Sequence, residues 1–206
     1  MRRRHPYENV KPDHPLFLLL ADIARQHRVV IDIHHDVVTR NISTLPPMLA
    51  RQLANPISLE PNVDAFERLL AHNRDARSVW AHAGSDLLRH WTAALSQSLL
   101  RRHSNLHMSI RLTPYPVFDN QIMDWTGEID AGRLDVFWKF PNRFVIGGDK
   151  IFVGKIPDHA PAAAFARRAS EKRSLTELFL SVLPSDLANK IGRRNALRLY
   201  RSVPRP

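Results

Sequence analysis

The sequence predicts an α/β fold in which parallel strands are joined by crossover helices, and three features favour it. Segments with helical apolar spacing alternate with strand-like segments four times along the chain. The strand-like segments are short, continuous apolar runs, which is typical of strands covered on both faces. The segments between successive strands are long enough for the crossover that parallel strands require.

Each element follows from a local pattern, in chain order. Apolar spacing after a proline predicts a helix over Leu16–His27, and a β-branched run predicts a strand over Val29–His34. A proline-interrupted connection with a short helix around Met48–Leu53 leads to a helix that begins after Asn62. The next segments are predicted as strand, helix, strand, helix and strand: Ser78–His82, Leu87–His103, Leu106–Leu112, Leu134–Phe140 and Phe144–Asp149. The remainder is predicted to be helical in pieces, with a capping box at Ser174–Glu177.

Composition excludes several classes of protein. The chain has 206 residues, enough for one domain with an apolar core, and it has no cysteine, which excludes disulfide scaffolds, thiolate nucleophiles and cysteine-ligated metals. No run approaches the roughly 18 apolar residues of a membrane span. The N-terminal Met-Arg-Arg-Arg is not followed by the apolar segment of a signal peptide. We therefore expect a cytoplasmic protein without a membrane partner.

The strong positive charge raises the hypothesis of a nucleic-acid-binding module. The formal net charge is +10, mostly from arginine. Apart from Arg2–Arg4 and three arginine pairs, the excess is scattered, and no aromatic-flanked basic stripe or recognition-module signature is present. A solvated, arginine-rich surface is the favoured interpretation, and nucleic-acid binding is kept as the alternative from another functional class.

Polar side chains that are costly to bury end three of the four predicted strands. They are His34, His82 and Asp149. Because sites in α/β folds form at the carboxyl ends of parallel strands, two imidazoles and a carboxylate there predict a metal or acid–base site. Each residue also has a structural interpretation, as a hydrogen-bonded histidine or a turn-forming aspartate. By strand alternation, His34 shares a face with Asp32, and His82 shares one with Trp80.

Five stretches of the chain, in order, resemble the amidohydrolase-related family of metal-dependent TIM-barrel enzymes. They resemble its fifth-strand region, sixth strand, seventh strand with its leading helix, eighth strand and closing helix: Asp13–Phe17 with Ile31–His34, Val79–Gly84, Arg101–Ser109, Asn142–Asp149 and Asn195–Tyr200. The resemblance implies the C-terminal half of a (βα)8 TIM barrel, strands five to eight, all parallel. Residues 1–12 would be a leader or linker, and residues 13–206 the half-barrel domain.

The chain also departs from the family. Gly148 stands where the family usually has serine before the last aspartate, and the His-x-His metal pair of the family's first strand has no counterpart. A complete barrel takes about 250 residues. Strands one to four are therefore expected to be missing from this chain.

The resemblance implies roles for individual residues. His34 would be a metal ligand, and Asp149 a metal ligand or the base that takes a proton from metal-bound water. His82 would be a second-metal ligand or an acid–base residue near the substrate. Arg111, at the end of the seventh strand, would bind a substrate carboxylate, or alternatively pair with Asp32 inside the barrel.

The implied cofactor is a divalent metal, with zinc favoured, and the implied reaction is hydrolysis of a C–N or C–O bond in a small carboxylated or cyclic substrate. Decarboxylases and hydratases of the same family are alternatives. An inactive fragment is another, because His34 and Asp149 are two ligands where a catalytic zinc usually has three. We expect homo-oligomers or association with a missing N-terminal half through unpaired strand edges. His35 points toward the opposite face from His34, so no role is expected for it.

Overall fold

A four-stranded parallel sheet forms the centre of the computed structural model, which describes residues 10–50, 56–83, 88–113, 121–124, 126–148 and 162–201. The strands are β1 (Ile31–Ile33), β2 (Ser78–Ala83), β3 (Leu106–Ile110) and β4 (Phe144–Ile146). They pair in parallel in the order β1-β2-β3-β4. The predicted α/β fold with four parallel strands in chain order is confirmed.

Helices lie between the strands, close to the predicted positions. Up to β4 they are α1 (Pro15–His27), α2 (Pro47–Ala50), α3 (Val63–His72), α4 (Ala93–Arg102) and α5 (Ala131–Lys139); after it come α6 (Ala162–Val182), α7 (Ser185–Asn189), the π-helical turn η1 (Lys190–Arg194) and α8 (Asn195–Tyr200).

Two helices begin elsewhere than predicted because side-chain caps set their first residues. α4 begins at Ala93 rather than Leu87, since the Thr92 hydroxyl accepts a hydrogen bond from the Leu95 N–H at 3.1 Å. α5 begins at Ala131 rather than Leu134, since the Asp130 carboxylate accepts one from the Arg133 N–H at 2.9 Å.

The predicted capping box at Ser174–Glu177 is wrong, because Ser174 lies inside the continuous helix α6. Leu175 and Phe179 of this helix pack against the main core, so tertiary contacts favour an unbroken helix across the motif. The Thr176 hydroxyl is satisfied within the helix, where it donates to the carbonyl of Lys172 at 2.7 Å. A local capping pattern was therefore overridden by packing.

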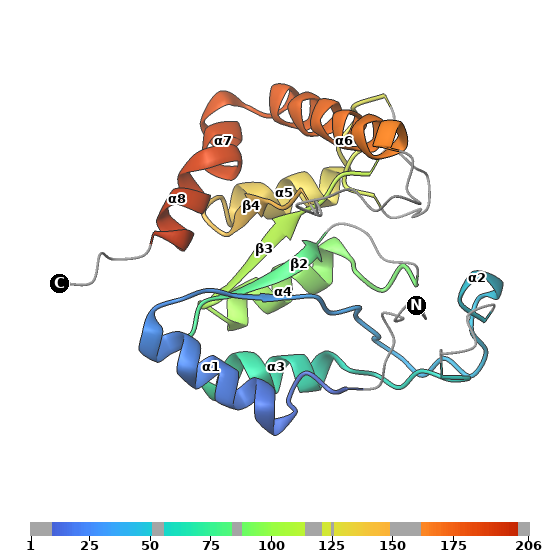
Figure 1. Ribbon diagram of the computed structural model, residues 1–206, viewed down its shortest axis with the longest axis vertical. Helices are drawn as coiled ribbons and strands as arrows, with labels where there is room; N and C mark the ends of the chain where they lie inside the picture. The colour runs from blue at the N-terminus through green and yellow to red at the C-terminus, as the bar shows by residue number, and fades with distance from the viewer. Residues whose placement is uncertain are drawn as a thin grey trace.

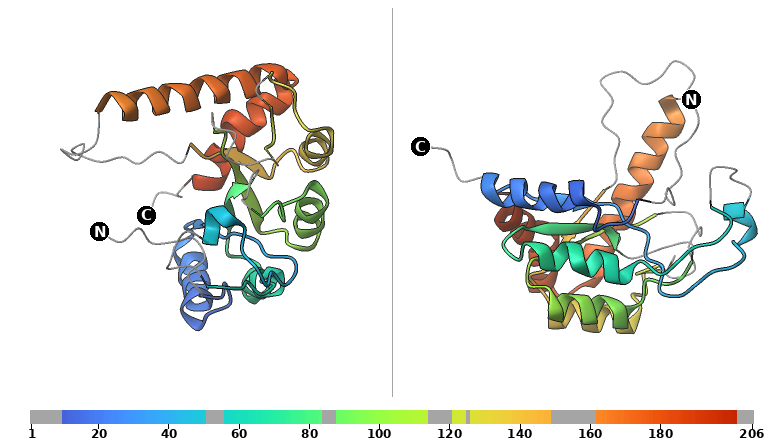
Figure 2. Two further views of the ribbon diagram at one scale, coloured as in Figure 1. Left: turned by 90° about the vertical axis from the view of Figure 1, so that its right-hand side faces the viewer. Right: turned by 90° about the horizontal axis from the view of Figure 1, so that it is seen from below.

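The main core lies on one face of the sheet, which α3, α4 and α5 line side by side (Figures 1 and 2), and Phe179 of α6, Leu187 of α7 and Ile191 of η1 also belong to it. Phe66 of α3, Leu99 of α4 and Phe137 of α5 belong to the same buried cluster as Trp80 and Met108 of the strands. On the opposite face, Leu199 of α8 covers Val79 and Val145. Within the described ranges, no helix has both the length and the apolar character needed to cross a bilayer.

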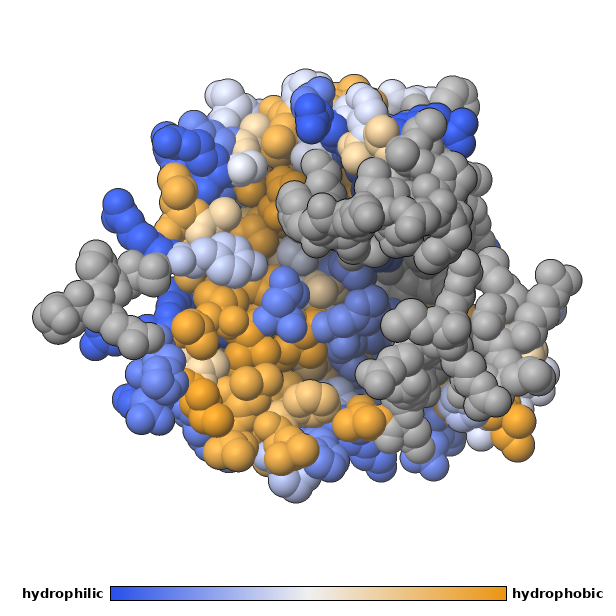
Figure 3. All heavy atoms as spheres, viewed as in Figure 1, coloured by the Kyte–Doolittle hydropathy of each residue, from blue (hydrophilic) through white to orange (hydrophobic). Residues whose placement is uncertain are grey.

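The prediction that every strand is covered on both faces fails at β1. Ile31 and Ile33 pack on Ala21 and Leu69, but Asp32 on the other face is exposed. Among the described residues, β1 pairs with β2 alone. Figure 3 shows apolar side chains gathered over the neighbouring α1, where the exposed large ones are Leu16, Phe17, Leu19, Leu20 and Ile23.

Buried polar side chains fix the amino ends of the strands. The Asn105 side-chain amide, just before β3, donates to the carbonyls of Leu70, Asn73 and Ala76 at 3.0, 3.2 and 3.0 Å. Arg143, just before β4, donates to the carbonyls of His103 and Leu106. These groups satisfy buried backbone acceptors, so this end of the sheet is built for stability.

Candidate functional site

The structure brings together the two histidines predicted at the ends of the first two strands. His34 follows β1 directly, and His82 lies near the end of β2, the adjacent parallel strand. Their imidazole ring centroids are 4.5 Å apart, and the rings are nearly perpendicular, at 84°. Two residues of the predicted site are thus neighbours at the carboxyl edge of the sheet.

His82 reaches this position through a break in the strand's regular alternation. Its backbone φ is 61°, and the pairing of β2 with β3 shifts register between Trp80 and Ala83. Trp80 faces the helix-covered core, with its ring 5.3 Å from that of Phe66. The expectation that His82 shares a face with Trp80 therefore does not hold, since the irregular backbone turns His82 toward His34. Such sparsely populated backbone angles cluster at functional sites.

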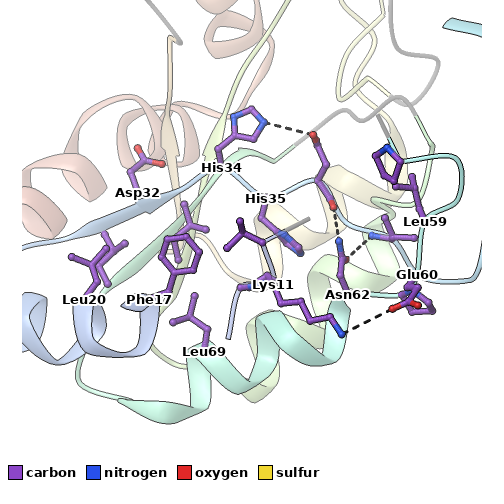
Figure 4. A pocket seen from close by; sticks show the side chains of 18 of the residues that line it. Lys11, Phe17, Leu20, Asp32, His34, His35, Leu59, Glu60, Asn62 and Leu69 are labelled. Carbon is purple, nitrogen blue, oxygen red and sulfur yellow. Dashed lines mark hydrogen bonds and ion pairs between the residues drawn. The ribbon is translucent and has the colours of Figure 1, made fainter. Parts of the chain in front are cut away.

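A carboxylate that the sequence reasoning did not single out lies beside His34. The Asp36 carboxylate is 3.7 Å from His34 Nε2, close enough for an ion pair with a protonated ring (Figure 4). The loop that carries Asp36 is held by Asn62, whose side chain donates to the Asp36 carbonyl at 3.0 Å and accepts from the Val38 N–H at 2.8 Å. The sequence signal for this neighbour is the spacing of His34 and Asp36, which are separated by a single residue.

Asp32 is a second carboxylate on this side of the sheet. Partial burial raises its pKa above the usual value, and the opposing influence is the positive charge of His34. Asp32 in turn raises the pKa of Tyr200 at the end of α8, which adds to the effect of burial on the phenol. Asp32 is therefore within electrostatic reach of both His34 and Tyr200.

His35 points away from His34, as expected. Its ring stacks on Phe66 at a centroid distance of 4.8 Å, in the helix-covered layer. Burial lowers its pKa to about 4, so the ring is neutral at pH 7. Its backbone carbonyl accepts a hydrogen bond from the Trp80 indole at 2.8 Å. The surroundings of His35 fit a structural role, in which it anchors the strand end that carries His34.

A cavity of about 630 Å³ opens beside this strand end (Figure 4). Asp32, His34, His35 and Asp36 are among the residues that line it. The apolar residues of the lining include Phe17, Leu20, Leu59 and Leu69. The Lys11 ammonium and the Glu60 carboxylate lie 4.0 Å apart at another part of the wall. A lining that combines apolar and charged groups suits a small ligand with both an apolar body and a polar group.

The other two predicted site residues are Asp149 and Arg111. Asp149 lies outside the described residues. Arg111 directly follows β3 and is partly buried, and its two expected roles stay predictions. Gly147, after β4, approaches β3 closely, since a Cβ there would stand 2.7 Å from the Ser109 hydroxyl oxygen. Gly147 therefore lets the ends of β3 and β4 come together just before Asp149.

The donor set agrees in kind with a transition-metal site but is incomplete in the described part of the chain. Two imidazoles suit zinc and related ions. Among the described residues, however, no group of three or more His, Asp or Glu side chains could hold a metal ion. The third donor implied by the resemblance, Asp149, lies outside the described part of the chain.

Comparison with protein-family models, with curated proteins and with solved structures finds no match to this chain in any of the three.

Proposed function

We propose that this chain is the C-terminal half of a (βα)8 barrel of the amidohydrolase-related type and contributes to a metal-dependent hydrolase site. The observation that carries the proposal is the contact between His34 and His82, with ring centroids 4.5 Å apart at the ends of adjacent parallel strands. Enzymes with parallel sheets build their metal and acid–base sites at this edge.

The sheet topology supports the half-barrel part of the proposal. A (βα)8 barrel pairs parallel strands in chain order, as β1 to β4 do. In the described part of the chain, β1 and β4 each have one partner strand, so both present a free edge. The exposed apolar side of α1 lies beside the β1 edge. Association with an N-terminal half, or with a second copy, would cover both features.

The proposal gives each residue of the site a task. His34 and His82 would hold a divalent cation together with Asp149, and zinc suits these donors. When bound, the cation would acidify a water molecule and polarise the scissile group. Asp36 would orient the His34 ring. Asp32, which lines the same cavity as His34, would exchange a proton with the substrate.

The cavity supports a small substrate. Its volume of about 630 Å³ lies within the range of small-molecule sites. Its apolar side fits a cyclic or hydrocarbon body, and Arg111 would pair with a carboxylate if its side chain faces the same mouth. We propose hydrolysis of a C–N or C–O bond in such a substrate. Decarboxylation and hydration use a similar set of groups, so substrate profiling must include them.

A cobalt titration tests the ligand assignment on the chain as it exists. Co²⁺ bound through imidazoles absorbs visible light, so its dissociation constant is measured directly. We expect weak binding by the native chain and a further loss of about tenfold or more in His34→Ala and in His82→Ala. His27→Ala is the matched control, because this exposed imidazole lies at the end of α1, away from His34.

Three results would count against the proposal. Equal binding by the native chain and the His34→Ala and His82→Ala variants would remove both residues from the site. Equal loss in His27→Ala would indicate non-specific imidazole binding. If the native chain holds one metal ion tightly and turns over substrate without a partner, the site is complete in itself and the half-barrel assignment is wrong.

A further inference from the structure

A second concave site lies at the amino ends of the strands, at the opposite end of the sheet from His34. Its volume is about 460 Å³, and four arginines line it, Arg25, Arg28, Arg77 and Arg201, with one acidic residue, Asp75. They come from the end of α1, the approach to β2 and the residue after α8, which meet on the left of Figure 1. We call this the arginine pocket.

One of the four arginines, Arg77, binds backbone carbonyls of the fold. The Arg77 guanidinium donates to the carbonyl of Leu199 at 2.6 Å and to the carbonyl of Arg28. It thereby ties the start of β2 to α8 and to the end of α1. These two carbonyls belong to helix ends, so Arg77 also offsets the partial negative charge that helix carboxyl ends carry.

The remaining arginines leave an excess of positive charge. Arg25 lies 3.9 Å from the Asp75 carboxylate, an exposed pair whose attraction is weak. Within the described ranges, no carboxylate lies within 4.0 Å of the Arg28 or Arg201 guanidinium. Four arginines against one aspartate give the lining a formal excess of three positive charges. Like charges gathered around one hollow repel one another, and a multivalent anion relieves that repulsion.

We propose that the arginine pocket binds a phosphate-class anion carried by a small molecule. Planar guanidinium groups match the oxygens of phosphate in paired hydrogen bonds, and several of them around one hollow favour a di- or polyanion over chloride. The pocket is in the size range of small-molecule sites. The inference is independent of the proposed hydrolase function, because none of these residues belongs to that site.

Pyrophosphate is the probe, and titration calorimetry at low ionic strength is the measurement. We expect Arg28→Gln and Arg25→Gln each to weaken pyrophosphate binding by about tenfold, since each removes a charge-assisted contact. Arg77 is left intact because its contacts support the fold. Arg167→Gln is the matched control, since it removes the same charge from α6, outside the pocket. At about 100 times the dissociation constant, pyrophosphate should also raise the unfolding temperature of the native chain by about 5 °C or more.

The same variants decide the source of the phosphate. A short single-stranded oligonucleotide is titrated in parallel, and the proposal expects its binding to be no stronger than that of pyrophosphate. If Arg28→Gln impairs oligonucleotide binding but not pyrophosphate binding, the surface is a nucleic-acid contact and the proposal is wrong. It is also overturned if native protein does not bind pyrophosphate, or if Arg167→Gln weakens binding as much as Arg28→Gln, which would indicate a general effect of charge.

Discussion

Replacing Asn105 by alanine should destabilise this protein more than an ordinary polar substitution, although Asn105 lies far from the candidate site. Its side chain is 6% exposed, and its amide nitrogen donates to the carbonyls of Leu70, Asn73 and Ala76. These acceptors lie at the end of α3 and in the turn that leads to β2. One amide therefore fixes the connection between α3 and two neighbouring strands.

The magnitude follows from the geometry. The amide has two protons for three acceptors at 3.0 to 3.2 Å, so its removal costs two shared hydrogen bonds. Each bond contributes about 1 kcal/mol net, and each buried acceptor left unpaired costs about 1–3 kcal/mol. We expect a loss of about 2–4 kcal/mol in the free energy of unfolding, a large share of a typical total of about 5–15 kcal/mol.

Urea unfolding followed by circular dichroism measures this loss. Asn105→Asp, which keeps the shape but removes both donors, should be destabilised at least as much as Asn105→Ala. Asn142→Ala is the control, because this asparagine is exposed and its backbone carbonyl, not its side chain, accepts from Arg198. The control should stay within about 0.5 kcal/mol of the native chain. If either Asn105 variant unfolds with the native free energy, the hydrogen bonds do not stabilise this connection.

Two further predictions concern the strands. Gly147→Ala should lower the free energy of unfolding in urea by about 1–3 kcal/mol, because the added Cβ would stand 2.7 Å from the Ser109 hydroxyl oxygen. Adding Ser109→Gly should recover part of this loss. If the losses of the two single variants simply add in the double variant, the contact is refuted. Burial and the nearby Arg143 lower the pKa of His107 to about 4, while the unfolded chain keeps the usual 6.5. The unfolded state therefore binds the proton more tightly, so stability attributable to His107 should be fully present above pH 6.5 and fall by about 3 kcal/mol as the pH drops to 4. His107→Leu should lack this component whereas His27→Leu should retain it, and identical pH profiles for native chain and His107→Leu would refute the assignment.

The candidate site is formed by residues that lie at the carboxyl edge of the sheet. Chain order and apolar runs were sufficient to predict that edge, because parallel strands joined by crossover helices place all their carboxyl ends together. The sequence therefore predicts that His34 and His82 lie at the same edge, and in the structure their ring centroids are 4.5 Å apart.

The residue pattern along the chain is enough to predict the four strands, their order and their parallel direction. Runs such as Val29–Ile33 and Phe144–Ile146 bury best as strands, and the lengths between them admit crossover helices. It determined the ends of helices less well, because a single side-chain cap such as Thr92 or Asp130 moves a helix start by several residues.

The assembly of the site depends on contacts between segments that are distant in the sequence. His82 faces His34 because the backbone of β2 leaves its regular alternation, and such a break depends on how β2 pairs with β3 rather than on local propensity. Asp36 lies beside His34 because Asn62, 26 residues further along the chain, holds its loop. The exposure of Asp32 likewise depends on which distant segments pack over each face of β1. Local patterns carry no record of such long-range contacts, since their energies arise only once distant segments meet.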